Sequence, residues 1–231
     1  MTNPDLLLLH GAAGSAAQFE PLSLALSDHF RVRCFDFEGH GSAPDRGRPF
    51  RTEHFAENVL EYLDSNRIET IAVFGYSMGG YVGMYLARTR PERIGRVMTL
   101  GSKFEWSEAV AAREVKLLDP DKILEKVPQF AKALEVRHTA NEWKVVLAKT
   151  REMMIALGKQ SALTPTDYGQ IRSAVRITVG DRDTTVGVEE AARVYRALPG
   201  GELGVFPNTP HPLEKVSPEM LARSAIEFFV A

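Results

Sequence analysis

Short apolar runs separated by longer amphipathic stretches are the feature that most limits how this chain can fold. Six runs, such as "DLLLLH" and "TIAVFG", are rich in Leu, Val, Ile and Phe and are followed by turn residues. Their length and composition are typical of buried strands, whereas the intervening segments have apolar residues at helical spacing. The predicted strands are residues 5–10, 30–37, 70–75, 94–101, 175–180 and 202–207. The predicted helices between and after them are residues 15–28, 52–65, 77–90, 188–198 and 217–230. Buried strands that alternate with helices indicate an α/β fold, with a mostly parallel sheet of about six strands covered on both faces.

One long segment interrupts this alternation. Residues 103–170 contain only helix-like stretches, such as "SEAVAAREVKLL" and "NEWKVVLAKTREMMIALGK". We therefore expect a core formed by residues 1–102 and 171–231, with residues 103–170 inserted as a helical cap.

Composition excludes several classes of function. The chain has 231 residues, 44% of them hydrophobic, which is enough for a well-packed core. Its net charge is −2 and it has no basic run, so a nucleic-acid partner is not expected. No apolar stretch reaches the roughly 18 residues of a membrane span, and the N-terminus lacks the basic region of a signal peptide. We expect a cytoplasmic protein, monomeric or homodimeric, that acts on a small molecule.

Metal and disulfide chemistry are also not expected. The chain has a single cysteine, Cys34, which lies in an apolar run, and it has no Cys-x-x-Cys or Cys-x-x-His spacing. We therefore predict neither a metal site nor a cofactor.

The stretch "GYSMGG" places a serine between glycines where a strand ends and a helix begins. Gly75 and Gly79 flank Ser77 at two residues on either side. A sharp strand-to-helix turn strains its central residue, and small neighbours relieve the crowding. The Ser77 side chain then projects at the carboxyl end of the sheet, above a helix N-terminus whose free N–H groups favour a developing oxyanion. This is the G-x-S-x-G pattern of a nucleophile elbow.

Five motifs in order give the chain a resemblance to the α/β-hydrolase family over nearly its whole length. They are "LLLLHGAAGS", "FDFEGHGSA", "GYSMGG", "VGDRDTTV" and "NTPHPLEKVSPEML". Many members of that family begin with two further antiparallel strands, whereas this chain begins almost directly at the strand before His-Gly. We therefore expect a reduced α/β-hydrolase fold of about six strands.

In this fold the serine is followed along the chain by an acid and then by a histidine. Of six histidines, only His211 follows both a late strand and a candidate acid. His138 lies in the helical insertion and is expected at the surface or at a helix cap, and His10 is expected to brace the turn after its strand.

Two aspartates compete for the role of the acid. The family's G-x-x-D pattern selects Asp183, and it leaves Asp181 as a turn-forming residue. Glu105 stays an alternative, because some members of the family carry the acid after the preceding strand. In this interpretation Ser77 attacks a carbonyl carbon, His211 transfers the proton, and Asp183 orients and stabilises the imidazolium.

The remaining site residues are those around the elbow and in the cap. We expect the backbone N–H of Met78 to be one oxyanion donor, and the resemblance implies that Ala12 supplies the other. Gly11 lets that loop approach the substrate closely, and Tyr76, beside the nucleophile, is expected to contact it. In the cap, Trp106 and Trp143 are expected to bind substrate. The wider set of apolar candidates for an acyl pocket is Phe104, Trp106, Phe130, Trp143, Met153 and Met154. At helical spacing such residues more often form the core of the cap, and that alternative stays open.

These residues favour a serine hydrolase that cleaves a carboxylic ester or lactone of a small, mainly apolar substrate through an acyl-enzyme. A serine nucleophile argues against the dehalogenase and epoxide-hydrolase chemistry of the family. Two alternatives remain: a carbon–carbon bond hydrolase or lyase that uses the same triad, and a ligand sensor without catalysis. Glu38 would disfavour anionic substrates if it faced the pocket, and it is otherwise expected to be a solvated loop carboxylate.

Overall fold

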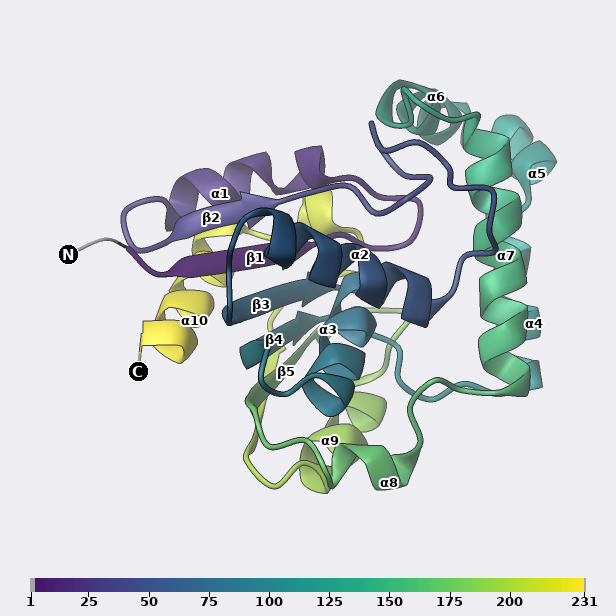
Figure 1. Ribbon diagram of the computed structural model, residues 1–231. Coiled ribbons are helices and arrows are strands. Elements are labelled where there is room, and N and C mark those ends of the chain that lie inside the picture. The colour runs from purple at the N-terminus through teal and green to yellow at the C-terminus, as the bar shows by residue number, and fades with distance from the viewer. Residues whose placement is uncertain (1–2, 231) are drawn as a thin grey trace.

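A parallel six-stranded sheet forms the centre of the computed structural model, which describes residues 3–230 (Figure 1). The strands are β1 (Asp5–Leu9), β2 (Arg31–Cys34), β3 (Ile71–Tyr76), β4 (Ile94–Leu100), β5 (Ala174–Gly180) and β6 (Gly201–Phe206). Their spatial order is β2-β1-β3-β4-β5-β6, and every neighbouring pair is parallel. The predicted number and direction of the strands are confirmed.

Alternate side chains of each strand enter two separate hydrophobic cores, because successive strand residues point to opposite faces of a sheet. Leu6 and Leu8 of β1 pack on one face, which is covered by α1 (Glu20–Leu26) and α10 (Pro218–Val230). Leu7 and Leu9 pack on the other face, which is covered by α2 (Thr52–Ser65), α3 (Met78–Thr89) and α9 (Val188–Ala197). Short 3₁₀ turns precede α1 and α10, at Ala16–Phe19 and Leu213–Lys215.

The edge strand β2 is shorter than its apolar run suggests. The run extends over residues 30–37, but pairing with β1 ends at Cys34. Beyond it, the Asp36 carboxylate accepts hydrogen bonds from the backbone N–H groups of Ala16 and Ser42, at 2.7 and 2.8 Å. The last residues of the run therefore form an irregular segment that joins two loops through Asp36.

Five helices lie between β4 and β5, where the sequence predicted a helical insertion. They are α4 (Glu108–Glu114), α5 (Pro120–Lys126), α6 (Pro128–Arg137), α7 (Trp143–Lys159) and α8 (Pro165–Tyr168), with a 3₁₀ turn at Val115–Leu118. Figure 1 shows α4, α5, α6 and α7 grouped beside one end of the sheet, whereas α8 lies next to α9. No helix within residues 3–230 is long and apolar enough to cross a membrane.

The strand order fixes where a site can form. The chain moves from β1 to β2 on one side and then crosses back to β3 on the other side of β1. At such a switch point the loops that follow the two strands diverge and leave a crevice at their carboxyl ends. The loop that begins at His10 and the turn at Ser77 therefore meet at this crevice.

Candidate active site

Ser77 occupies a strained turn between β3 and α3. Its backbone has φ 51° and ψ −116°, in the left-handed half of conformational space that residues with a side chain rarely adopt. A Cβ atom on Gly79 would overlap the Leu9 carbonyl oxygen, and one on Gly75 would overlap the backbone of Gly80. Both flanking glycines are thus required by close backbone approach. The turn is held by hydrogen bonds from Ser77 N to the Leu100 carbonyl oxygen and from Ser102 Oγ to the Ser77 carbonyl oxygen, both 2.8 Å.

Asp183 and His211 form a hydrogen-bonded pair at the same edge of the sheet. Asp183 Oδ2 lies 2.7 Å from His211 Nδ1, and the aspartate side chain is only 2% exposed. The other carboxylate oxygen accepts hydrogen bonds from the N–H groups of Thr185 and Val186, each 2.8 Å long. Because both oxygens are occupied, the carboxylate is fixed in the orientation that presents Oδ2 to the imidazole.

Gly101, the residue after β4, supports this pair. It has φ +58°, and a Cβ there would lie 3.0 Å from Asp183 Oδ2 and 3.2 Å from His211 Nδ1. A side chain at position 101 would therefore push the aspartate and the histidine away from the sheet edge. Nothing in the sequence reasoning had singled out this residue.

The two alternative acids lie elsewhere. Asp181 Oδ1 accepts a hydrogen bond from Thr209 N at 3.1 Å, which is a turn-stabilising contact. Glu105 pairs with Arg193 through both carboxylate oxygens, at 2.6 and 2.7 Å. Of the three acids considered, the structure brings Asp183 to His211.

A small cavity of about 50 Å³ opens beside the elbow. Ser77, Met78 and Ala12 contribute to its wall, and Met78 begins α3, where backbone N–H groups have no partner within the helix. No hydrogen bond joins the Ser77 hydroxyl to His211 within residues 3–230. Such contacts are often long before a substrate binds. The other residues that line the cavity are Thr52, Tyr81, Lys103, Trp106, Glu114, Met153, Met154, Leu157 and Thr185.

Some of the expected substrate contacts lie in this cavity and others do not. Trp106, Met153 and Met154 line it, as the sequence suggested. Trp143 does not: it packs in a cluster among α5, α6 and α7 and against Ala13, because its position on α7 faces α5 and α6. Neither phenylalanine lines the cavity either, so neither forms the acyl pocket considered for it. Phe104 is buried in the main core beside Tyr168, and Phe130 is 41% exposed.

Tyr76 supports the histidine loop and does not line the cavity. It is buried, and its hydroxyl donates a hydrogen bond of 3.0 Å to the His211 carbonyl oxygen. Burial raises the pKa of Tyr76, so the hydroxyl stays protonated and remains a donor. A Cβ on Gly11 would meet the Tyr76 ring at 2.9 Å and Ser77 Cβ at 3.2 Å. Gly11 thus lets its loop pack directly against the elbow. Neither Gly11 nor Tyr76 lines the cavity, so their expected contact with substrate is replaced by a role in packing.

Two buried histidines connect the loop after β1 to its surroundings. His10, which was expected to brace the turn, donates from Nδ1 to the Gly11 carbonyl oxygen at 2.8 Å and accepts at Nε2 from Phe37 N at 3.1 Å. His138 was expected at the surface or at a cap. It does end α6, but it is only 3% exposed because it lies between two core loops. Burial lowers the pKa of each of these histidines to about 4.

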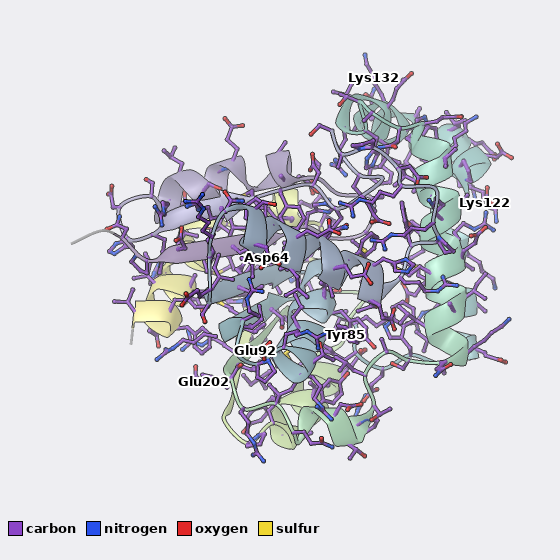
Figure 2. The ribbon with its side chains drawn as sticks, viewed as in Figure 1. Asp64, Tyr85, Glu92, Lys122, Lys132 and Glu202 are labelled. Atoms are coloured by element: carbon purple, nitrogen blue, oxygen red, sulfur yellow. The ribbon has the colours of Figure 1, made fainter. Side chains whose placement is uncertain are left out.

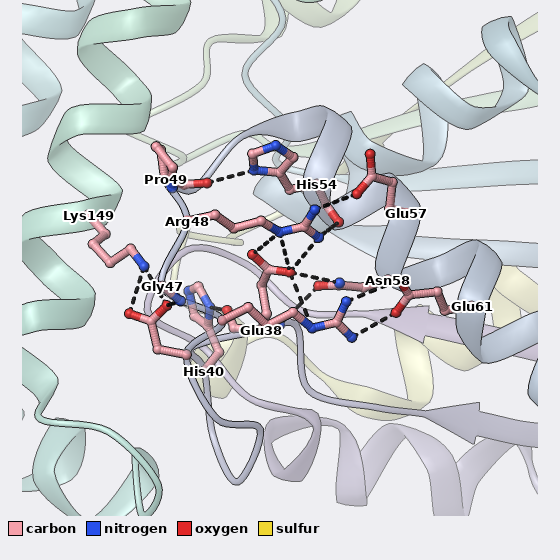
Figure 3. A network of polar contacts seen from close by, with 12 residues as sticks. Glu38, His40, Gly47, Arg48, Pro49, His54, Glu57, Asn58, Glu61 and Lys149 are labelled. Atoms are coloured by element: carbon pink, nitrogen blue, oxygen red, sulfur yellow. Dashed lines mark hydrogen bonds and ion pairs between the residues drawn. The ribbon is translucent and has the colours of Figure 1, made fainter.

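Glu38 was expected either to face the pocket or to be a solvated loop carboxylate, and both expectations are wrong. Its side chain is neither part of the cavity wall nor solvated. Its side chain is 1% exposed and lies in a polar network shown in Figure 3. Arg48 donates from Nη2 and Nε at 2.7 and 2.9 Å, and Asn58 Nδ2 donates at 3.0 Å. Burial acts to raise the pKa of the Glu38 carboxyl, but the hydrogen bonds from Arg48 and Asn58 outweigh it and hold that pKa below its usual value. Glu38 therefore stabilises its loop.

Sequence reasoning missed the polar part of the cavity wall. Lys103, Glu114, Thr52 and Thr185 all line the cavity. A lysine and a glutamate in a predicted loop and helix are typical of solvated positions. One signal was present: Lys103 lies two residues after the predicted strand 94–101, whose carboxyl end lies beside the elbow.

Comparisons with known proteins agree with this geometry. A sequence profile of the alpha/beta hydrolase fold family matches residues 4–143. The 2-(acetamidomethylene)succinate hydrolase of Mesorhizobium japonicum is 23% identical, over 100% of this chain and 89% of its own. A pimeloyl-[acyl-carrier protein] methyl ester esterase from Aeromonas salmonicida is 33% identical, over 43% of this chain and 38% of its own.

The fold is matched among solved structures as well. The enol-lactonase from Burkholderia xenovorans superposes with a TM-score of 0.81 at 20% identity, over 100% of this chain and 93% of that one. The chain belongs to the alpha/beta hydrolase fold family, and it is a hydrolase of that fold.

Proposed function

We propose that the protein is a serine hydrolase that cleaves a carboxylic ester or lactone through an acyl-enzyme, with Ser77, His211 and Asp183 as its triad. The observation that carries the proposal is the 2.7 Å contact between Asp183 and His211 at the strand edge where the Ser77 elbow projects. Because Nδ1 faces the carboxylate, it carries the ring proton, and Nε2 is left as the base that takes the proton from Ser77 Oγ.

The steps follow from these roles. Ser77 Oγ attacks the carbonyl carbon and passes its proton to His211. The negative charge that develops on the carbonyl oxygen is bound by the backbone N–H groups of Ala12 and Met78, each worth roughly 3–4 kcal/mol of barrier. His211 then protonates the departing alcohol, and a water activated by the same imidazole releases the acid. Throughout, Asp183 stabilises the imidazolium.

Two similar proteins are described as enzymes that cleave an ester or a lactone, which supports the proposed bond. One relative is described as a methyl ester esterase and one structural neighbour as an enol-lactonase. We also propose that residues 103–170 act as a cap that covers the acyl group, because Trp106, Met153 and Met154 come from this segment and line the cavity beside Ser77.

The proposal is tested by a fluorophosphonate probe and intact-mass spectrometry of the wild type, Ser77→Ala and His211→Ala. We expect one adduct on the wild type, located on Ser77, and none on either variant. Hydrolysis of p-nitrophenyl acetate with a burst of one equivalent would then report the acyl-enzyme. A folded wild type that gives no adduct contradicts the proposal and favours a ligand sensor. Labelling at Ser77 with activity only on carbon–carbon bonds would favour the alternative hydrolase or lyase.

A further inference from the structure

Lys103, a residue that lines the cavity beside Ser77, carries a buried ammonium group. Its side chain is 8% exposed, and Nζ donates a hydrogen bond of 2.6 Å to the Thr185 carbonyl oxygen. Two carboxylates lie farther away, Glu114 Oε1 and Glu190 Oε2, each 3.7 Å from Nζ. Burying charges is costly unless they are paired and hydrogen-bonded. This group of charges is paired, but its hydrogen bonding is incomplete.

Lys103 has spare donors. An ammonium group has three N–H donors. One is used by the Thr185 carbonyl oxygen, and the distances of 3.7 Å to the two carboxylates are longer than hydrogen bonds. Donor capacity therefore remains on a residue that lines the cavity.

Glu114, on the cap helix α4, has a spare acceptor. Its side chain is 7% exposed, and Oε1 accepts from Arg113 Nη2 at 2.9 Å and Nε at 3.2 Å. No hydrogen bond within residues 3–230 reaches Oε2 of Glu114. Because Glu114 also lines the cavity, an unused donor from the core and an unused acceptor from the cap border the same space.

Glu190, the remaining member of this group of charges, already binds the backbone. Glu190 Oε1 accepts hydrogen bonds from the N–H groups of Phe104 and Glu105, at 2.7 and 3.0 Å. Lys103 and Arg113 balance Glu114 and Glu190 in charge. An anionic substrate group placed here would add a negative charge with no cation left to neutralise it, whereas a neutral group would leave the balance intact.

The acyl part of the substrate is the part that reaches these residues. In the proposed mechanism His211 protonates the departing alcohol, and His211 does not line the cavity, whereas Ser77, Ala12 and Met78 do. The alcohol thus leaves on the side of His211, and the acyl group that stays on Ser77 occupies the cavity. The cavity is small, so the acyl chain that it accepts should be short.

We infer that the enzyme selects short acyl groups that carry a neutral hydrogen-bonding substituent, a hydroxyl or an amide, which accepts from Lys103 and donates to Glu114. The inference rests on the proposed function and names its substrate class. Because Lys103 follows β4 and Glu114 ends α4, such a substituent also links the core to the cap when the substrate is bound.

The test compares ethyl butanoate, ethyl 3-hydroxybutanoate, ethyl 3-acetamidopropanoate and monoethyl succinate, with acid release followed in a pH-stat. For the wild type we expect kcat/KM for the hydroxy or the amide ester to exceed that of ethyl butanoate at least tenfold. The ratio of kcat/KM for the hydroxy or amide ester to kcat/KM for ethyl butanoate should fall at least fivefold in Lys103→Met and in Glu114→Gln. Lys122→Met is the matched control. Lys122 is exposed, lies at the outer edge of the cap (Figure 2), and should leave the ratio unchanged.

The outcomes separate the two proposals. Equal kcat/KM for the neutral esters, or a preference for monoethyl succinate, overturns the inference, and so does hydrolysis of none of the four esters by an enzyme whose Ser77 is labelled by the fluorophosphonate. Absence of labelling overturns the proposed function itself. If Lys103→Met does not fold, as judged by thermal unfolding, Glu114→Gln compared with Lys122→Met still tests the inference.

Discussion

His138, at the end of α6, donates a hydrogen bond from Nε2 to the Ala13 carbonyl oxygen, 3.2 Å away. Its Nδ1 accepts from Gly41 N at 3.0 Å, and Arg137 Nη1 donates to the same Ala13 oxygen at 2.9 Å. Both nitrogens of a neutral imidazole are thus used, with the proton on Nε2. The residue beside Ala13 is Ala12, the proposed oxyanion donor, so the end of α6 holds the loop that carries this donor.

Replacing His138 with Ala should slow catalysis and weaken the fold. Removal of the imidazole leaves the buried N–H of Gly41 without its acceptor, which costs about 1–3 kcal/mol of unfolding free energy. It also loosens the Ala12 loop, and we expect kcat on p-nitrophenyl acetate to fall roughly tenfold, less than the ~10²–10³ that follows the loss of a whole oxyanion donor. Urea unfolding and steady-state kinetics measure the two effects. The exposed His29 offers a control, and His29→Ala should match the wild type. An unchanged kcat in His138→Ala would show that the contact serves stability alone.

Asp183→Asn should remove activity without unfolding the protein. The asparagine oxygen can still accept from Thr185 and Val186, so its amide group then faces His211 Nδ1 and forces the ring proton onto Nε2. The histidine loses its role as a base, and kcat should fall about 10⁴-fold, as in other triads with this change. Asp181→Asn keeps its contact with Thr209 and should retain most of the activity. The reverse pattern in the two variants would transfer the role of the acid to Asp181.

Ser77→Gly should be more stable than Ser77→Ala, although both are inactive. Ser77 has φ 51°, and residues held in such regions cost roughly 1–3 kcal/mol, which a glycine relieves and an alanine does not. After the extra entropy of glycine in the unfolded chain is subtracted, we expect a difference of about 1 kcal/mol in urea unfolding. Ser65, exposed in α2, is the matched position. There the alanine variant should be the more stable one, because glycine disfavours a helix. Equal stability of the two Ser77 variants would contradict strain at the elbow.

The sequence predicted the sheet and the elbow because both depend on local patterns. Residues 71–74 are apolar throughout, as a strand covered on both faces requires, and the glycines around Ser77 are dictated by close backbone approach. The preference for Asp183 over Asp181 came from resemblance to a family, and the residues alone left both open.

The interior of the cap was not predictable in the same way. Trp143 and Phe130 have the helical spacing of either a pocket wall or a packed helix face, and only the arrangement of α5, α6 and α7 places one inside the cap and the other partly in solvent. Lys103 and Glu114 were missed for a related reason. Their charges suggest solvent, but they are buried together by contacts between segments that meet only in the folded chain.

A group of buried histidines should make the protein sensitive to mild acid. His10, His40 and His138 are all 3% exposed or less, and the ring of His40 lies 5.2 Å from that of His10 and 5.8 Å from that of His138. Burial lowers the pKa of His10 and His138 to about 4 and that of His40 well below its usual value. Their unfolded-state pKa is about 6.5. Between these values the unfolded chain binds more protons than the native one, so stability is complete above pH 6.5 and is lost as the pH falls towards 4.

The expected slope is up to roughly 1.4 kcal/mol of unfolding free energy per pH unit for each of these histidines. Urea unfolding at several values between pH 7.5 and 4.5 measures it. The carboxylates whose pKa values are lowered, such as Asp36 and Glu38, lose their contribution only near pH 4, so a decline that starts above pH 5 belongs to the histidines. His40→Phe, which keeps a ring against Phe50 but cannot bind a proton, should flatten the slope. His29→Phe, at an exposed position, should leave the slope as it is. A wild type whose stability is constant down to pH 5 would mean that these histidines are as easily protonated in the native protein as in the unfolded chain.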